Sequence, residues 1–414
     1  MREHEFSRAV LAEPVRALLR GADVAFALTG DSWTVQIRVR QGEASVDRGD
    51  ATARFTLRAS DDVWGRVLAA SPEPGWQSVL HLVRTGTIDV LGDERAFFRH
   101  LHIVRTLVEA VRPAPADAPR RPRRLAATGR YERVDSALGT ADVYIERCGS
   151  GPQILALATA GSDTSQWHGI MTDSDLTDAF ELITVDLPWH GRSSPVFGGR
   201  PGEWALTPET YTEFIVAAAD AIGLNRPVLV GVSMAGAAVV HAVATHPARF
   251  AGGVACQAGR RVRNRASDLL RAPDLDQSTL VPEWTHGLMN PASPAEFRAR
   301  VWWGYSSGGA GLYAADIDSY LAWDFDEIAH LLTPASPHIA VLSGSYDTTV
   351  TPEASRELAA AIPNSSFAEM PELGHFPHAE NPARFASYLT PALHRVLGEQ
   401  RGDADEATRG ATRP

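Results

Sequence analysis

Cysteine is scarce in this sequence: Cys148 and Cys256 are the only two among 414 residues. Two cysteines are too few for a framework of disulfide bonds, so the composition favours a reducing compartment. The opening residues, MREHEFSRAV, carry charges throughout and contain no apolar stretch, so no secretory signal peptide is predicted. No apolar run approaches the length of a membrane span either. We therefore expect a soluble cytoplasmic protein.

Positive charge is also in short supply, because the formal net charge is −11 at pH 7. Without an excess of Lys and Arg the chain cannot neutralise a phosphate backbone, so a nucleic-acid partner is not expected. A basic cluster at residues 120–124 is interleaved with proline and is typical of a solvated linker. His378 follows His375 by three residues, but no Cys or Glu cluster accompanies this pair. We expect no metal and no cofactor, and the sequence predicts no particular oligomeric state.

Hydrophobic residues are plentiful, and at 44% of 414 residues they suffice for two domains with cores of their own. Residues 1–112 combine an apolar periodicity typical of a helix over 1–20 with alternating strand patterns at 24–28, 33–39 and 55–57. Helices near 61–68 and over 95–111 frame a last strand at 87–90. This pattern of helices and antiparallel strands predicts a small α+β domain.

This first domain resembles the sterol carrier protein-like lipid-transfer fold. The residues that carry the resemblance are the run FALTGDSWTVQIRV, the segment FTLRASDDVWGRVL and the close IDVLGDERAFFRHL. The resemblance implies an apolar ligand held between sheet and helices. The competing interpretation is a core in which Trp33, Phe55, Trp64 and Phe97 pack against one another and bind nothing, which we favour because aromatic stripes are usually core.

Residues 113–128 are predicted to be a linker, since PAPADAPRRPRR over 113–124 cannot bury a core. From 129 to 398 apolar strands alternate with helices, for example strands at 154–158, 182–186, 228–230, 253–256 and 339–343 and helices at 208–221 and 352–361. Such alternation predicts a mostly parallel sheet covered by helices on both faces. The polar tail over 399–414 is predicted to be disordered.

The stretch VLVGVSMAG at 228–236 predicts a strand, a sharp turn that carries Ser233, and a helix. That order is typical of a nucleophile elbow, which lifts a serine hydroxyl above the sheet at the N-terminus of a helix. Small neighbours are needed around such a turn. Gly231 provides one on the near side, whereas Ala235 stands on the far side and Gly236 follows it.

An activated serine needs a histidine to take its proton and a carboxylate to orient that histidine. The strand at 339–343 leads into GSYDTTVTP, which contains Asp347, and a short strand at 367–370 leads into PELGHFPHAENP, which contains His375. Both residues therefore follow strands, as Ser233 does. The chain order Ser233, Asp347, His375 is the order of an α/β-hydrolase triad.

With these motifs the second domain resembles an α/β hydrolase that carries a cap. DLPWHGRSSP at 186–195 is similar to the family's DxxGHGxS loop, with Trp189 where a glycine is customary, and THPARF at 245–250 closes the elbow helix. The loop after the first parallel strand reads ATAGSD and lacks the customary His-Gly pair. By alignment with the family, the oxyanion donors are the backbone amides of Met234 and Ala160, with Thr159 as the other candidate. A similar TAGSD loop marks a branch of the family.

A long insertion at about 260–325 is predicted to form a helical cap over the substrate pocket, as insertions at this point of the fold usually do. It is rich in aromatic residues, which favours an apolar or aromatic small-molecule substrate, although cap helices also need aromatics for their own packing. The residues assigned to the pocket are Trp189, Trp302, Trp303 and Tyr305.

Together these patterns predict a serine hydrolase that cleaves an ester or lactone of an apolar or aromatic molecule through an acyl-enzyme. Two alternatives remain open on the sequence. A C–C bond hydrolase acting on a diketone-like substrate would use the same triad. A catalytically idle protein that binds a lipid or polyketide would be consistent with the missing His-Gly pair.

Overall fold

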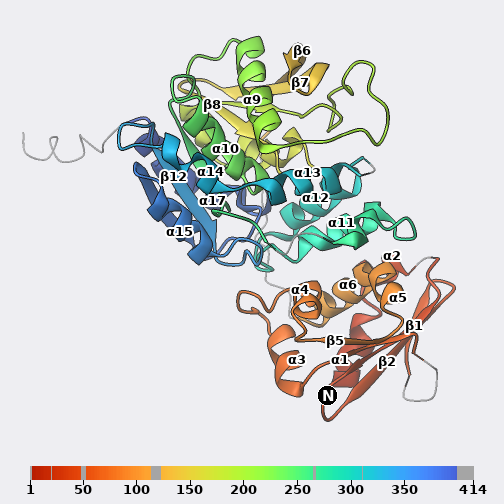
Figure 1. Ribbon diagram of the computed structural model, residues 1–414. Coiled ribbons are helices and arrows are strands. Elements are labelled where there is room, and N and C mark those ends of the chain that lie inside the picture. The colour runs from red at the N-terminus through yellow and green to blue at the C-terminus, as the bar shows by residue number, and fades with distance from the viewer. Residues whose placement is uncertain are drawn as a thin grey trace, which may run out of the picture. The chain divides into compact units, whose positions relative to one another are not determined.

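The computed structural model describes residues 2–19, 21–47, 53–112, 123–263, 267–309 and 311–398. The turn expected at 48–50, residues 113–122 of the linker and the tail at 399–414 lie outside this range. Contacts divide the described chain into two compact units. Unit 1 contains the described residues before 121 together with Ser267–Ser307 and Tyr346–Thr348, and unit 2 contains the remainder. Figure 1 shows the chain as a ribbon and labels many of its helices and strands.

Unit 1 is an α+β structure whose sheet has the strand order β3-β2-β1-β4-β5. Its strands are β1 (Val24–Thr29), β2 (Thr34–Arg40), β3 (Glu43–Asp47), β4 (Phe55–Arg58) and β5 (Asp89–Gly92). Its helices are α1 (Arg2–Ala9), α2 (Glu13–Leu18), α3 (Asp61–Val67), α4 (Val79–Arg84), α5 (Glu94–Arg99), α6 (Leu101–Val111), α11 (Gln277–His286) and α12 (Ala295–Ser306), with a 3-10 turn at Asp268–Arg271.

Three local expectations for this unit were wrong. The helix over 1–20 is two helices, because Pro14 lies in the first turn of α2, where its missing N–H costs nothing, and would break a continuous helix. The helix over 95–111 is interrupted at His100, whose φ of −115° and ψ of 15° are not helical. Strand β4 pairs with β1 in parallel, so the sheet is mixed and not wholly antiparallel.

The aromatic residues expected to pack together do so in two pairs. The rings of Trp33 and Trp64 meet edge to face with centroids 5.8 Å apart. The rings of Phe55 and Phe97 have the same arrangement and the same separation. Trp64, Phe55 and Phe97 have no exposed surface, so their contacts belong to the core of the unit.

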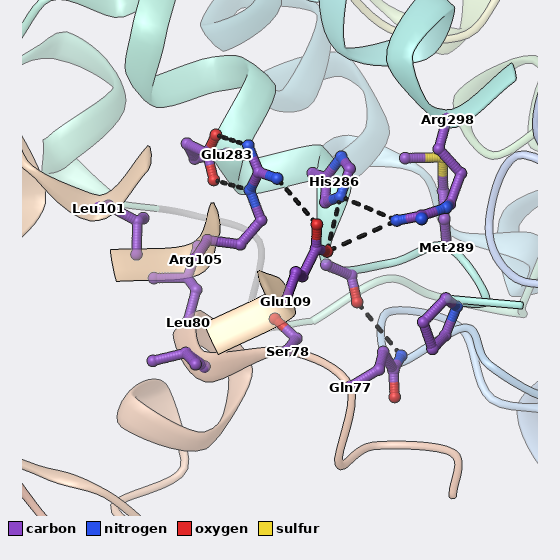
Figure 2. Close-up of a pocket in the computed structure, with 13 residues that line it drawn as sticks. Gln77, Ser78, Leu80, Leu101, Arg105, Glu109, Glu283, His286, Met289 and Arg298 are labelled. Carbon is purple, nitrogen blue, oxygen red and sulfur yellow. Dashed lines mark hydrogen bonds and ion pairs between the residues drawn. The ribbon is translucent and has the colours of Figure 1, made fainter. Parts of the chain in front are cut away.

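A buried ion pair joins α6 to α11 within unit 1, as Figure 2 shows. Arg105 donates through Nε and Nη2 to the two carboxylate oxygens of Glu283, each at 2.8 Å. Burial alone would lower the pKa of Arg105, but the carboxylates of Glu283 and Glu109 raise it. Burial also opposes ionisation of Glu283, yet Arg105 lowers the pKa of its carboxyl. Both groups are therefore charged, and the indole Nε1 of Trp302 on α12 donates to the same carboxylate at 2.7 Å.

Glu109 extends this network toward the end of α11. Its Oε1 accepts from His286 Nε2 at 3.0 Å and lies 3.5 Å from Nη1 of Arg298 on α12 (Figure 2). The cavity beside these side chains has a volume of about 20 Å³, which is enough for about one water molecule. Gln77 lines it and donates through Nε2 to the carbonyls of Gly287 at 3.2 Å and Tyr346 at 3.0 Å. These bonds link Ser267–Ser307 and Tyr346–Thr348 to the N-terminal elements of the unit.

Unit 2 contains a sheet with the strand order β13-β12-β11-β10-β8-β9-β7-β6. Strands β9, β8, β10, β11, β12 and β13 run parallel, whereas β7 is antiparallel to both β9 and β6. The mostly parallel sheet expected from the sequence is therefore confirmed. The strands are β6 (Thr128–Ser136), β7 (Gly139–Gly149), β8 (Gln153–Leu157), β9 (Glu181–Val185), β10 (Val228–Val232), β11 (Gly252–Cys256), β12 (Ile339–Gly344) and β13 (Ser365–Met370).

Helices cover the sheet of unit 2 and bury its apolar strands. Helices α7 and α17 share a core with the central strands, in which Phe385 and Leu389 of α17 meet residues such as Val230 and Leu342. The helices are α7 (His168–Asp173), α8 (Leu176–Ala179), α9 (Pro208–Ile222), α10 (Met234–Thr245), α13 (Leu312–Ala322), α14 (Phe325–Ile328), α15 (Pro352–Ala361), α16 (Pro377–Glu380) and α17 (Pro382–Val396), with 3-10 turns at Thr164–Trp167 and Ala329–Leu331. Among the described residues, no helix has the length and apolar character required to cross a bilayer.

The region expected to form the cap is thus divided between the two units. Helices α11 and α12 group with unit 1, and α13 groups with unit 2. The two halves are held by different partners, because α11 bonds to α6 through Glu283 whereas α13 packs on α9 and α10.

Replacing Arg105 with alanine should destabilise unit 1 by about 3–5 kcal/mol, because Glu283 would remain buried without its partner. The side chains of Arg105 and Glu283 are 18% and 1% exposed. Arg99→Ala is the matched control, since the Arg99–Asp274 pair is more than one-third exposed on both sides and should contribute about 1 kcal/mol or less. Urea unfolding of both variants measures the difference, and equal losses would contradict a structural role for the buried pair.

Candidate active site

Ser233 lies in a strained turn between β10 and α10, as the sequence predicts. Its φ of 62° and ψ of −124° fall in a region that L-residues rarely adopt. Its backbone N–H donates to the carbonyl of Cys256 on the neighbouring strand at 2.9 Å, and its own carbonyl accepts from Ala237 at 3.1 Å. The turn is therefore held on both sides. The side chain is buried, with 4% of its surface exposed.

Close packing of α10 on the sheet explains the small residues around Ser233. A Cβ atom at Gly231 would lie 2.3 Å from the carbonyl oxygen of Ala235, and one at Gly236 would lie 2.4 Å from that of Cys256. Glycine is thus required at 231 and 236. Alanine is accommodated at 235, where the family customarily has glycine.

Asp347 and His375 occupy loops that follow strands at the same edge of the sheet. Asp347 comes three residues after β12 ends at Gly344, and His375 comes five residues after β13 ends at Met370. Because β10, β11, β12 and β13 are parallel neighbours, their carboxyl ends share one edge. Both side chains are buried. Their catalytic roles remain a prediction, and Asp347 belongs to the segment that groups with unit 1.

Gln257, which sequence reasoning missed, ties the histidine loop to the strands. It follows β11 with a left-handed φ of 53° and has no exposed surface. Its Nε2 donates to the carbonyl of Gly374 at 2.6 Å, and its Oε1 accepts from the amide of Gly344 at 3.1 Å. The buried carboxylate of Glu380 accepts from the amide of Gly374 at 2.6 Å. The residue that precedes His375 is therefore fixed through both its amide and its carbonyl.

The predicted oxyanion loop follows β8. Thr159 directs its hydroxyl to Oε1 of Gln166 at 3.0 Å, and its backbone N–H to the same atom at 3.4 Å. These bonds favour Ala160 over Thr159 as the source of a donor to substrate. Met234, the other predicted donor, begins α10, where the first backbone N–H groups have no acceptor within the helix.

In the loop after β9, Trp189 stands at a position where the resembling family customarily has glycine. Trp189 has a left-handed φ of 71°, a conformation that normally favours glycine. Its backbone N–H donates to the carbonyl of Ser194 at 3.1 Å. Asp186 accepts from the amides of Thr164 at 2.7 Å and Arg192 at 2.9 Å, which closes the loop. Burial raises the pKa of Asp186 to about 6, although these N–H donors oppose the shift.

His190, in the same loop, is fully engaged by two acceptors. Its Nδ1 donates to the carbonyl of Pro188 at 2.9 Å and its Nε2 to Asp316 at 3.0 Å. Two acceptors require hydrogens on both ring nitrogens, which is the charged form. Burial alone would lower the pKa of His190, but the carboxylate of Asp316 and the carbonyl of Pro188 raise it.

A cavity of about 200 Å³ opens beside this loop in unit 2. Its walls are apolar side chains and glycines. The lining residues are Trp189, Pro201, Gly202, Trp204, Gly309, Gly311 and Leu312. The other predicted pocket residues lie on α12 in unit 1: Trp302 bonds to Glu283, Trp303 is 64% exposed and Tyr305 is buried. Of the predicted pocket residues, Trp189 is the one that lines this cavity.

His378, three residues after His375, is buried; among the described residues, no group of three or more His, Cys, Asp or Glu side chains is arranged so that it could hold a metal ion. Burial lowers the pKa of His378 to about 3, so its ring is neutral. Its Nε2 lies 3.4 Å from Oε1 of Gln166, and its ring packs 4.5 Å from that of Trp167. These contacts support the loop that carries Thr159 and Ala160.

The stability that His190 contributes should decrease as pH rises. Its folded pKa lies above the unfolded value of 6.5, so the contribution is complete below pH 6.5 and is lost as pH rises through the folded pKa. The unfolding free energy of the unsubstituted protein minus that of His190→Gln should therefore be larger at pH 6.5 than at pH 9.5. His241→Gln is the control, because burial lowers the pKa of His241 and no such decrease should occur. A difference independent of pH would contradict a charged His190.

Comparison with known proteins places this architecture in a family. The alpha/beta hydrolase family matches residues 154–388, more than half of the chain. Comparison with curated protein sequences gives no match. Similar solved structures include a thermophilic esterase from Thermogutta terrifontis, which is 22% identical to this chain. The alignment covers 65% of this chain and 99% of the esterase, and the TM-score is 0.53.

Two further structures have the same fold at similar identities. The enol-lactonase of Burkholderia xenovorans LB400 is 21% identical, with 63% of this chain and 97% of that chain covered and a TM-score of 0.51. A bromoperoxidase from Bacillus anthracis is 19% identical, with 64% and 99% covered and a TM-score of 0.55. The family match, the parallel sheet and the strained serine turn agree, and the chain belongs to the alpha/beta hydrolase family.

Proposed function

We propose that this hydrolase cleaves an ester or lactone through a triad of Ser233, His375 and Asp347. The observation that carries the proposal is the backbone of Ser233, which is held in a rare conformation between a parallel strand and a helix N-terminus. A residue stays in a rare backbone conformation only where the surrounding structure holds it there, and such residues occur most often at active sites. The loops with Asp347 and His375 follow β12 and β13, parallel strands of the same sheet, which supports the other two roles.

In the proposed reaction, His375 takes the hydroxyl proton of Ser233 as the serine oxygen forms a bond to the acyl carbon. The amides of Met234 and Ala160 stabilise the negative charge on the carbonyl oxygen. The C–O bond to the leaving alcohol then breaks, and His375 returns the proton to that alcohol. Water repeats the sequence on the acyl-enzyme and releases the acid, while Asp347 orients the imidazole and stabilises its charged form.

An apolar or aromatic substrate is supported by the cavity between Trp189 and Trp204. A cavity of about 150 Å³ is enough to bind benzene, so about 200 Å³ can hold a substituted ring. The indole of Trp204 is fixed because its Nε1 donates to Asp316 at 2.7 Å. We propose that the cavity receives the apolar part of the substrate. Esters and lactones are proposed as the bonds because they require the least assistance to the leaving group.

Two further elements of the proposal concern the whole chain. A sterol carrier protein-like fold for the N-terminal domain is supported by the five-stranded sheet of unit 1 and the helices that accompany it, whereas its packed aromatic core favours a domain that binds no ligand. A cytoplasmic location is supported by the two cysteines, both of which are free and buried.

A fluorophosphonate probe should form a covalent adduct with the protein, detectable as a mass increase. Ser233→Ala should abolish the adduct and lower kcat on aryl acetates by about 10⁴-fold or more, because the nucleophile is lost. Ser387→Ala, at an exposed serine of α17, should be labelled like the unsubstituted protein. Absence of an adduct on the unsubstituted protein would refute the serine hydrolase proposal.

Replacing Trp189 with alanine should raise KM for 1-naphthyl acetate by about 10-fold, since about 1.4 kcal/mol of aromatic contact is lost. KM for vinyl acetate should change by less than about 2-fold, because this ester has no aromatic ring and loses no aromatic contact with residue 189. Phe197→Ala is the control, because Phe197 is an exposed aromatic residue outside the cavity lining. Equal changes in KM for both esters would argue against an aromatic subsite.

A further inference from the structure

Asp316 is a carboxylate with no exposed surface on α13, in the C-terminal half of the predicted cap. Its Oδ2 accepts from the backbone amide of Gly161 at 2.7 Å and from His190 Nε2 at 3.0 Å. Its Oδ1 accepts from the indole Nε1 of Trp204 at 2.7 Å. One buried side chain therefore joins two loops of unit 2, the loop after β8 and the long loop between β9 and α9. A buried carboxylate that accepts several N–H bonds is strongly held.

The bond to Gly161 lies next to the predicted oxyanion donor. Gly161 follows Ala160 directly, and the φ of Gly161 is 67°, a left-handed conformation. A Cβ atom there would lie 2.8 Å from the ring of Tyr313 and 3.0 Å from its Cα, so α13 packs directly on this loop. The peptide that carries the Gly161 N–H also contains the carbonyl of Ala160. Its orientation consequently limits the direction of the Ala160 amide.

We propose that Asp316 is a positioning residue that holds the oxyanion loop in its active geometry. This inference rests on the proposed function, because it assigns Asp316 to the same reaction. Asp316 does not touch the reacting atoms; it fixes the peptide beside Ala160 and so keeps the Ala160 amide aimed at the developing oxyanion. A misplacement of about 1 Å at such a donor can cost about 100-fold in rate, and loss of a donor costs about 10²–10³-fold.

The same face of α13 also reaches the histidine loop. Tyr320 is four residues after Asp316, and side chains at that spacing share one face of a helix. Its hydroxyl donates to the carbonyl of Gln257 at 2.9 Å. Gln257 in turn donates to the carbonyl of Gly374, the residue before His375. One helix therefore contacts the oxyanion loop directly and the histidine loop through Gln257.

Asparagine at 316 would retain the shape of the side chain but would replace one acceptor oxygen with a donor. The NH₂ group of the asparagine then faces either the indole N–H of Trp204 or the N–H groups of Gly161 and His190. Because all of these are donors, at least one hydrogen bond is lost. Asp316→Asn should lower kcat by about 10- to 100-fold on both vinyl acetate and 1-naphthyl acetate. With vinyl acetate, which has no ring for the Trp204 cavity, KM should change by less than about 3-fold.

Amide hydrogen exchange provides a readout of position that does not depend on turnover. Residues 158–162 should exchange faster in Asp316→Asn than in the unsubstituted protein. Asp318→Asn, at an exposed position of the same helix, is the matched control and should alter neither the exchange nor kcat.

A second variant covers the possibility that Asp316→Asn does not fold, which circular dichroism would reveal. Gly161→Ala leaves Asp316 in place but pushes the loop against Tyr313, and it should reproduce the loss in kcat. If Asp316→Asn folds and its kcat lies within about 2-fold of that of the unsubstituted protein, the inference is overturned. If Asp316→Asn does not fold, the same result for Gly161→Ala overturns it. Either outcome leaves the hydrolase proposal intact. If the unsubstituted protein neither forms the fluorophosphonate adduct nor cleaves esters, the hydrolase proposal itself fails and this inference fails with it.

Discussion

The close approach of α10 to β10 and β11 is the constraint on which the candidate site depends. Gly231 and Gly236 allow backbone to meet backbone at distances that a Cβ atom would prevent. Ser233 is held between them in a conformation that costs of order 1–3 kcal/mol, and the bond from its amide to Cys256 helps to offset that cost. A rigid turn of this kind presents the side chain without requiring a mobile loop.

Buried polar groups hold the loops around this turn. Gln257 and Glu380 fix the peptide before His375, Asp186 closes the loop that carries Trp189, and Asp316 joins that loop to the residue after Ala160. In the interior such groups must be paired, because an unpaired polar group costs about 1–3 kcal/mol. The pairing specifies one arrangement of loops that have little regular structure of their own. Through Asp316, helix α13 bonds both to the loop after β8 and to the loop that carries Trp189 and His190.

Much of the fold follows from local patterns. The continuous apolar strands β8 to β13 and the helices predicted at 208–221 and 352–361 agree with the structure within a few residues, because burial on both faces leaves a strong signal. The turn at Ser233 was predicted because glycine and serine at that spacing are required by its geometry. The breaks at residues 10–12 and at His100 were missed, as was the parallel pairing of β1 with β4. Helical periodicity continues across a short break, and strand direction depends on the connections between strands.

The sequence by itself determined most of the strands and helices, the turn that carries the candidate nucleophile Ser233, and the loops that carry Asp347 and His375, since each of these depends on residues that are neighbours in the chain. Tertiary structure alone decided which polar residues are buried together. Asp316 and Gly161 are 155 residues apart, and α11 bonds to α6 while α13 packs on α9 and α10. Such pairings arise from folding in three dimensions, because a polar side chain in a helix gives no local sign of the partner that it will meet.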